Sequence, residues 1–128
     1  MTTITKIATA MFTVSDQDAA VAFYTDKLGW EVRTDVSFGA GDAAGRWVEV
    51  SPPGSDAVLA LNTPMAGEAG GGGVGVETPD LDTELARLKD QGVQVGEPMG
   101  GEGPVPRMFS VTDPDGNWIW VAQPGPQG

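Results

Sequence analysis

The feature that most constrains the fold of this chain is an internal repeat. Thr13–Val32 (TVSDQDAAVAFYTDKLGWEV) matches Glu77–Val95 (ETPDLDTELARLKDQGVQV), with aspartates and a glycine at corresponding places. Farther along, Val48–Pro64 matches Phe109–Pro124, and each of these segments reads as a strand, a Pro/Gly turn and a second strand ending in proline. The repeat therefore predicts two copies of a strand–helix–strand–strand–strand module in one chain.

A glycine-rich segment separates the two copies. Met65–Gly73 (MAGEAGGGG) has no hydrophobic periodicity, which is typical of a connector. We therefore expect module 1 over about residues 1–64, a linker over 65–72 and module 2 over about 73–124. A length of 128 residues suits one domain, so both modules are expected to form a single α+β domain, residues 1–128.

Capping residues and apolar spacing predict one helix in each module. Ser15 or Asp16 can cap the first helix, and Gly29 suits the left-handed position that follows a helix. In the second helix, Thr78 is the expected cap and Pro79 takes the first turn. The predicted strands are Ile4–Val14, Trp30–Val36, Trp47–Ser51, Ala57–Asn62, Gly73–Glu77, Val93–Val95, Met108–Thr112 and Trp118–Gln123.

Composition excludes several classes of site and partner. The chain has neither cysteine nor histidine, which removes disulfides, Ser-His-Asp and Cys-His catalysis, and histidine-ligated metals. Its net charge of −11 would repel phosphate backbones and anionic lipid headgroups, so neither nucleic acid nor membrane is an expected partner. No long apolar stretch or cleavage site marks an export signal, and we expect a cytoplasmic protein.

Three motifs, in order along the chain, carry a resemblance to a known family. They are Val14-Ser15-Asp16 before the first helix, Phe23–Trp30 (FYTDKLGW) at its end, and Asp113–Ile119 (DPDGNWI) before the last strand. Together they resemble the glyoxalase / bleomycin-resistance / extradiol dioxygenase superfamily, also called vicinal oxygen chelate proteins. The resemblance implies two βαβββ modules whose curved mixed sheets enclose a cleft, with the helices outside. It also implies a homodimer, with modules paired within one chain or exchanged between two.

Enzymes of that superfamily hold a divalent metal with His, Glu or Gln from the first and last strands of each module. The corresponding positions of this chain are Thr9, Ala60, Gly73 and Trp120. A first-row divalent ion needs several N, O or S donors, and these four residues offer one hydroxyl. We therefore expect no metal and no other cofactor.

Strand alternation predicts which side chains face the expected cleft, because successive residues of a strand point to opposite sides. If Phe109 and Val111 pack under a helix, Ser110 and Thr112 face the cleft. Tryptophans can stack on flat ligands and attract cations, and Glu49 could supply a countercharge. The predicted ligand-binding residues are Thr9, Met11, Trp47, Glu49, Met108, Trp118 and Trp120. The competing interpretation is that these tryptophans serve the core or a dimer interface, and that Glu49 is only solvated.

Two functional hypotheses follow. The first is a metal-free binding protein, similar to the bleomycin-resistance branch, that sequesters a small, planar, cationic antibiotic or metabolite. The alternative is an enzyme: a metal-independent lyase or isomerase with Glu49 or Glu77 as base and Tyr24 as a weaker acid candidate, or a glyoxalase-type lyase or dioxygenase with a non-standard metal site. The sequence identifies no definite catalytic residue, and Glu49 is a weak candidate.

Overall fold

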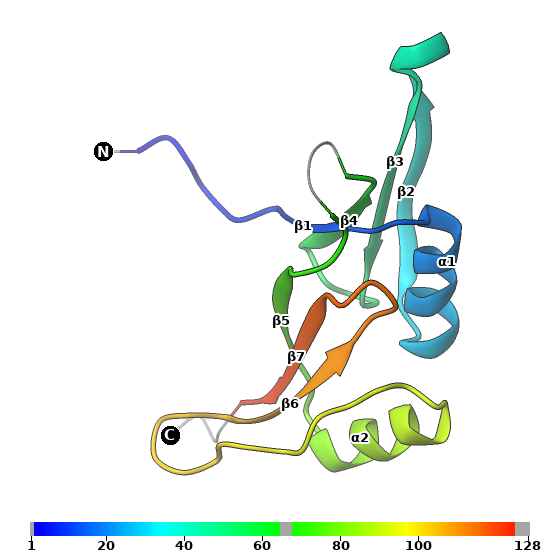
Figure 1. Ribbon diagram of the computed structural model, residues 1–128. Helices are drawn as coiled ribbons and strands as arrows, with labels where there is room; N and C mark the ends of the chain where they lie inside the picture. The colour runs from blue at the N-terminus through cyan, green and yellow to red at the C-terminus, as the bar shows by residue number, and fades with distance from the viewer. Residues whose placement is uncertain (1, 65–67, 125–128) are drawn as a thin grey trace. The chain divides into compact units, whose positions relative to one another are not determined.

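The repeat corresponds to two units, each built from one sheet and one α-helix (Figure 1). The computed structural model describes residues 2–64 and 68–124 of the chain. Unit 1 is Met1–Ala69 and unit 2 is Gly70–Gly128. Two mixed sheets with helices agree with the predicted α+β class and its repeated modules.

Unit 1 has a four-stranded mixed sheet in the order β1-β4-β3-β2. Strand β1 runs parallel to β4, whereas β4 pairs antiparallel with β3, and β3 pairs antiparallel with β2. The elements are β1 (Thr9–Thr13), α1 (Gln17–Ala22), a π-helical turn (Phe23–Lys27), β2 (Glu31–Phe38), a 3₁₀ turn (Gly41–Ala43), β3 (Gly45–Ser51) and β4 (Val58–Asn62).

Unit 2 repeats this topology with one strand fewer. Its elements are β5 (Gly73–Glu77), α2 (Leu81–Asp90), β6 (Arg107–Thr112) and β7 (Trp118–Gln123), and the sheet order is β5-β7-β6. Again the first strand is parallel to the last one. The strand predicted at Val93–Val95 is wrong, because this segment makes only an isolated bridge from Val95 to Val111.

The first strand is shorter than predicted. It begins at Thr9, which is paired with Val58, the first residue of β4. The preceding segment gains no strand partner in the described residues, and Ile4 and Ile7 remain 78% and 89% exposed. The length of β1 is therefore set by its partner strand and not by its own alternation.

Each helix begins at an aspartate cap. Asp16 accepts a hydrogen bond from Ala19 N at 3.1 Å, and Asp80 accepts one from Thr83 N at 3.1 Å. Of the two residues predicted as possible caps of the first helix, Asp16 is the cap. The predicted cap Thr78 is wrong, because its hydroxyl accepts from Asp80 N in the turn before the helix.

The core of each unit lies between its sheet and its helix, and it follows the expected period of two. In unit 1, Val48 and Val50 are completely buried while Trp47 and Glu49 between and beside them are half-buried. The buried members of the alternating set are Val48, Val50, Leu59, Leu61, Phe109, Val111, Ile119 and Val121. Ala60 is the exception, since it is expected on the other face yet is fully buried. Its methyl group is short, and its register partners Met11 and Glu49 are both larger.

The turn before β7 attaches the incoming chain to unit 2. The buried Asp113 carboxylate accepts hydrogen bonds from Asn117 N at 2.9 Å and Asn117 Nδ2 at 3.0 Å. Asn117 Oδ1 then accepts from Gly72 N at 2.9 Å, and Gly72 O accepts from Trp118 N at 2.8 Å. The end of the predicted linker is therefore held at the turn, which aligns β5 with β7.

Candidate functional site

The tryptophans of unit 2 share one face of its sheet. Trp120 is in register with Gly75 on β5 and with Ser110 on β6, and Trp118 is in register with Gly73 and Thr112. Directly paired residues of neighbouring strands project to the same side of a sheet. We call the side that carries these residues the tryptophan face of unit 2.

The residues that flank Trp120 on the neighbouring strands are small. The residues beside Trp120 are a glycine and a serine, and Gly96 N donates to Ser110 O at 2.9 Å on the far side of β6. Trp118 is 48% exposed. Along β7 the two tryptophans are about 7 Å apart, since two strand residues span that distance. A flat molecule of two or three fused rings could contact both.

Met108 joins this face, and it brings in a residue that the sequence-based prediction missed. Met99 and Met108 exchange two backbone hydrogen bonds, N to O and O to N, both 2.8 Å long. Such a pair has its side chains on one side, so Met99, which is 56% exposed, belongs to the tryptophan face. No strand pattern surrounds Met99, and only the pairing itself could have revealed it.

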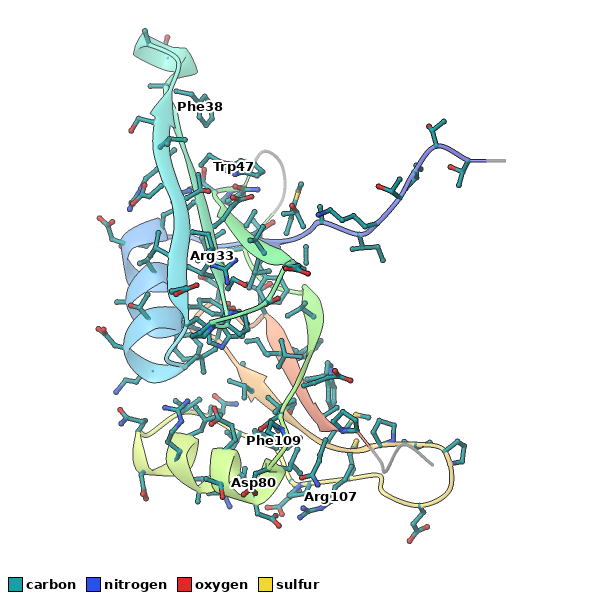
Figure 2. All side chains as sticks on the ribbon, turned by 180° about the vertical axis from the view of Figure 1, so that it is seen from behind. Arg33, Phe38, Trp47, Asp80, Arg107 and Phe109 are labelled. Atoms are coloured by element: carbon teal, nitrogen blue, oxygen red, sulfur yellow. The ribbon has the colours of Figure 1, made fainter. Side chains whose placement is uncertain are left out.

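The predicted residues of unit 1 also share a face. Glu49 is in register with Thr34 on one side and Ala60 on the other, and Ala60 is in register with Met11. Trp47 is two residues before Glu49 and therefore on the same side, where it is paired with Val36. Figure 2 shows Trp47 and Phe38 projecting from the β2–β3 hairpin.

Thr9 completes the unit 1 set, two residues before Met11 on β1 and in register with Val58. The structure thus brings Thr9, Met11, Trp47 and Glu49 together on one sheet. It brings Met108, Trp118 and Trp120 together on the other. Each set lies within its own unit.

The polar groups on these faces have no protein partners among the described residues. The indole N–H groups of Trp47, Trp118 and Trp120 take part in none of the hydrogen bonds there, and the same holds for the Glu49 carboxylate. No buried side-chain nitrogen or oxygen of the described residues lacks a partner. These groups therefore reach solvent, where a ligand could bind them.

The four arginine side chains are in ion pairs. In unit 1, Arg46 donates to Asp35 at 2.8 Å and to Asp18 of α1 at 2.6 Å, and these contacts raise the pKa of Arg46 and lower that of Asp35. Arg33 donates to Glu31 at 2.7 Å. In unit 2, Arg87 and Arg107 are paired with carboxylates of α2. Arg107 donates to Asp82 of α2 at 2.8 Å.

On the described strands of unit 2, this leaves the tryptophan face without arginine or lysine. Arg46 and Arg107 alternate with Trp47 and Met108, so they point to the helix side. In unit 1, the face of Glu49 also carries Glu31, which is in register with Ser51, and Arg33 donates to Glu31 at 2.7 Å. In unit 2, the charged strand residue on the tryptophan face is Glu77. The tryptophan face of unit 2 therefore has a carboxylate for a cation and no strand arginine or lysine for an anion.

The positions at which the superfamily's enzymes hold metal do not fit a metal ion in this chain. Thr9 offers a neutral hydroxyl, Ala60 and Gly73 offer no side-chain donor, and the Trp120 indole offers only an N–H. Among the described residues, no group of three or more Asp and Glu side chains is placed to hold one elsewhere.

The catalytic candidates are not arranged as an acid–base pair. Tyr24 is completely buried in unit 1, where its ring contacts Phe23 and Trp30, each at a centroid distance of 5.3 Å. Glu49 is on β3 of unit 1, and Glu77 is an exposed residue of β5 in unit 2. Proton abstraction would need a second group at one of these carboxylates.

The chain belongs to the Glyoxalase/Bleomycin resistance protein/Dioxygenase superfamily, whose family model matches residues 6–121. This confirms the resemblance carried by the three motifs. No curated protein matches the sequence. No helix of the described residues is both long and apolar enough to cross a membrane.

Solved structures with the same fold include an antibiotic-binding protein. The chain is similar to TnmS3, an antibiotic binding protein from Streptomyces sp. CB03234, with 32% identity over 98% of this chain and 100% of that one, and a TM-score of 0.83. A superfamily member from Sphaerobacter thermophilus DSM 20745 has 29% identity over 94% and 98% of the chains and a TM-score of 0.83. A glyoxalase/bleomycin resistance protein from Streptomyces sp. CB03234 has 32% identity over 92% and 100%, with a TM-score of 0.77.

Proposed function

We propose that this protein is a metal-free binding protein that sequesters a small, planar, cationic antibiotic or metabolite in the cytoplasm. The observation that carries the proposal is the tryptophan face of unit 2. Trp118 and Trp120 are about 7 Å apart along β7, Trp120 has a glycine and a serine beside it, and the indole N–H groups have no partner in the described residues. Tryptophan is the best aromatic partner for a cation.

The similarity to TnmS3 supports a role in antibiotic binding. That protein binds an antibiotic, and its chain and this one match over almost their full lengths. Sequestration needs affinity and no chemistry, which suits a chain whose family metal positions carry Thr9, Ala60, Gly73 and Trp120. Such binding would make this a resistance protein if the ligand is toxic.

A positive charge on the ligand is supported by the distribution of charge. The Glu49 carboxylate is half-buried beside Trp47 and has no ion-pair partner among the described residues. A carboxylate in such surroundings gains most from a cation that stacks on the neighbouring ring. The net charge of −11 would also concentrate cations around the whole protein at low ionic strength.

We also propose that the protein is a homodimer. Several large apolar side chains of unit 1 remain exposed, and Val36 and Phe38 of the hairpin are 52% and 54% exposed. Monomeric proteins seldom expose contiguous apolar patches of this kind. A twofold partner would cover them by the same surface on each copy.

The enzyme alternative gains no specific observation from the structure. Its acid candidate, Tyr24, has no access to ligand, and neither carboxylate candidate has a second catalytic group beside it within its own unit. The sequestration proposal needs neither group to transfer a proton.

A thermal-shift titration tests the proposal. We expect N-methylacridinium, a planar cation, to raise the melting temperature, with a stabilisation that grows as the logarithm of 1 plus the ratio of ligand concentration to Kd. Acridine, its neutral analogue at pH 8, should raise it less. Elemental analysis of protein purified without chelator should find no stoichiometric Zn, Ni, Fe or Mn. Binding of neither acridine compound, or bound metal with an activity lost on chelation, would contradict the proposal.

A further inference from the structure

Three glycines lie inside the strands of the described residues, and two of them have no structural reason to be glycine. At Gly45 the Phe38 ring lies so close that a Cβ atom would overlap it. At Gly75 a Cβ atom would meet nothing within 4 Å, and at Gly73 it would meet only the Trp118 carbonyl oxygen at 4.0 Å. Neither residue has a positive φ angle. Neither the backbone angle nor the space around a Cβ atom therefore requires glycine at these two positions.

Glycine at such positions weakens the strand. It loses more backbone freedom on folding than other residues and has no side chain to pack. Inside strands it often marks a bulge, a sharp bend or a place where a ligand or another backbone comes close. The β5–β7 pairing continues in one register from Gly73 to Glu77, so there is no bulge. The remaining reason is that a ligand or another backbone comes close to these glycines.

The two glycines lie on the tryptophan face, each beside an indole. Gly75 is in register with Trp120, and Gly73 with Trp118. Neighbouring strands are about 4.8 Å apart, so the bare backbone of β5 forms a flat strip one strand away from both rings. Ser110 and Thr112 occupy the opposite side of β7, where side chains limit the approach.

We propose that Gly75, with Gly73 beside it, is the specificity determinant of this site. The strip admits a rigid, fused polycyclic aromatic cation that lies against the backbone of β5 while it contacts Trp118 and Trp120. The inference rests on the proposed function and deepens it, because it names the side of the tryptophans on which the ligand binds and the class of ligand that fits.

Valine and alanine at Gly75 test this inference with N-methylacridinium as the probe. Gly75→Val places a branched side chain in the ligand's position and should raise the Kd at least about tenfold. Gly75→Ala should have a smaller effect. The melting temperature of the free protein should stay the same or rise, since valine favours strands. Ser37→Val is the matched control, because Ser37 is an exposed residue of β2 on the side opposite Trp47.

The possible outcomes separate the inference from the proposed function. If wild-type protein binds neither N-methylacridinium nor acridine, the proposed function itself is contradicted. If wild type binds and Gly75→Val binds with the same Kd, only the role of the glycine strip is overturned. Sedimentation covers the remaining case: loss of binding together with a change in oligomeric state would show that Gly75 meets another copy's backbone, which also overturns the inference.

Discussion

Replacement of Trp120 by alanine tests whether an indole of unit 2 contributes to ligand binding. Loss of an aromatic ring stacked on a planar cation costs about 1–3 kcal/mol, or roughly a 5- to 150-fold increase in Kd. The free energy of unfolding should decrease by less than it does for a tryptophan in the core. The register neighbours of Trp120 are Gly75 and Ser110, so truncation opens no cavity in the buried core. The loss should stay below the roughly 3–5 kcal/mol typical of a core tryptophan.

The assay is a titration of tryptophan fluorescence with N-methylacridinium, supported by circular dichroism to show that the variant is folded. Trp30→Phe is the matched control, because Trp30 precedes β2 and contacts the buried Tyr24 ring. It removes an indole signal without touching the tryptophan face. A folded Trp120→Ala variant with wild-type affinity would refute the argument and indicate a role in packing or in the dimer interface.

Three further predictions concern charge, assembly and a helix cap. Glu49→Gln should weaken binding of N-methylacridinium but not of acridine, and added salt should reduce the contrast; equal weakening of both compounds would exclude Glu49 as the countercharge. Sedimentation at micromolar concentration should give a dimer, and a monomer there would contradict the proposed assembly. Hydrogen bonds from the Thr83 hydroxyl and backbone N–H lower the pKa of Asp80, so its stabilisation of α2 should be full above the unfolded-state pKa and be lost as pH falls through the lower folded-state pKa. Asp80→Asn should remove this part of the acid sensitivity, as measured by thermal melts across pH, and an unchanged pH profile would contradict the assignment.

Local patterns predicted most of the fold because each module repeats the same signals. Strands β5 and β7 have the predicted bounds, and glycines follow both helices at Gly29 and Gly92 with φ angles of 79° and 76°. The alternation of β3 and β4 placed Val50 and Leu59 in the core. These features depend on residues close in sequence, for which periodicity and capping are good guides.

The errors occur where long-range pairing decides the structure. The strand predicted at Ile4–Val14 is longer than β4, its partner, so only Thr9–Thr13 is paired and forms a strand. Val93–Val95 has strand-like residues but makes a single bridge to Val111. Met99 lies at the candidate site because it pairs with Met108, and no strand pattern in the sequence around Met99 indicates this. In each case the partner strand carries the information, and one segment's sequence does not contain it.

The distribution of charge links the acidic composition to the candidate site. All four arginines are in ion pairs with carboxylates. Arg46 and Arg107 lie on the helix side of their sheets, whereas Arg33 of β2 is paired with Glu31 and also donates to Ser55 O at 2.9 Å. These exposed pairs add little stability individually. They neutralise the paired acidic groups, while the Glu49 carboxylate has no ion-pair partner among the described residues. Within unit 1, a planar cation on the face of Glu49 would therefore meet an unpaired carboxylate and the ring of Trp47 on one side of the sheet.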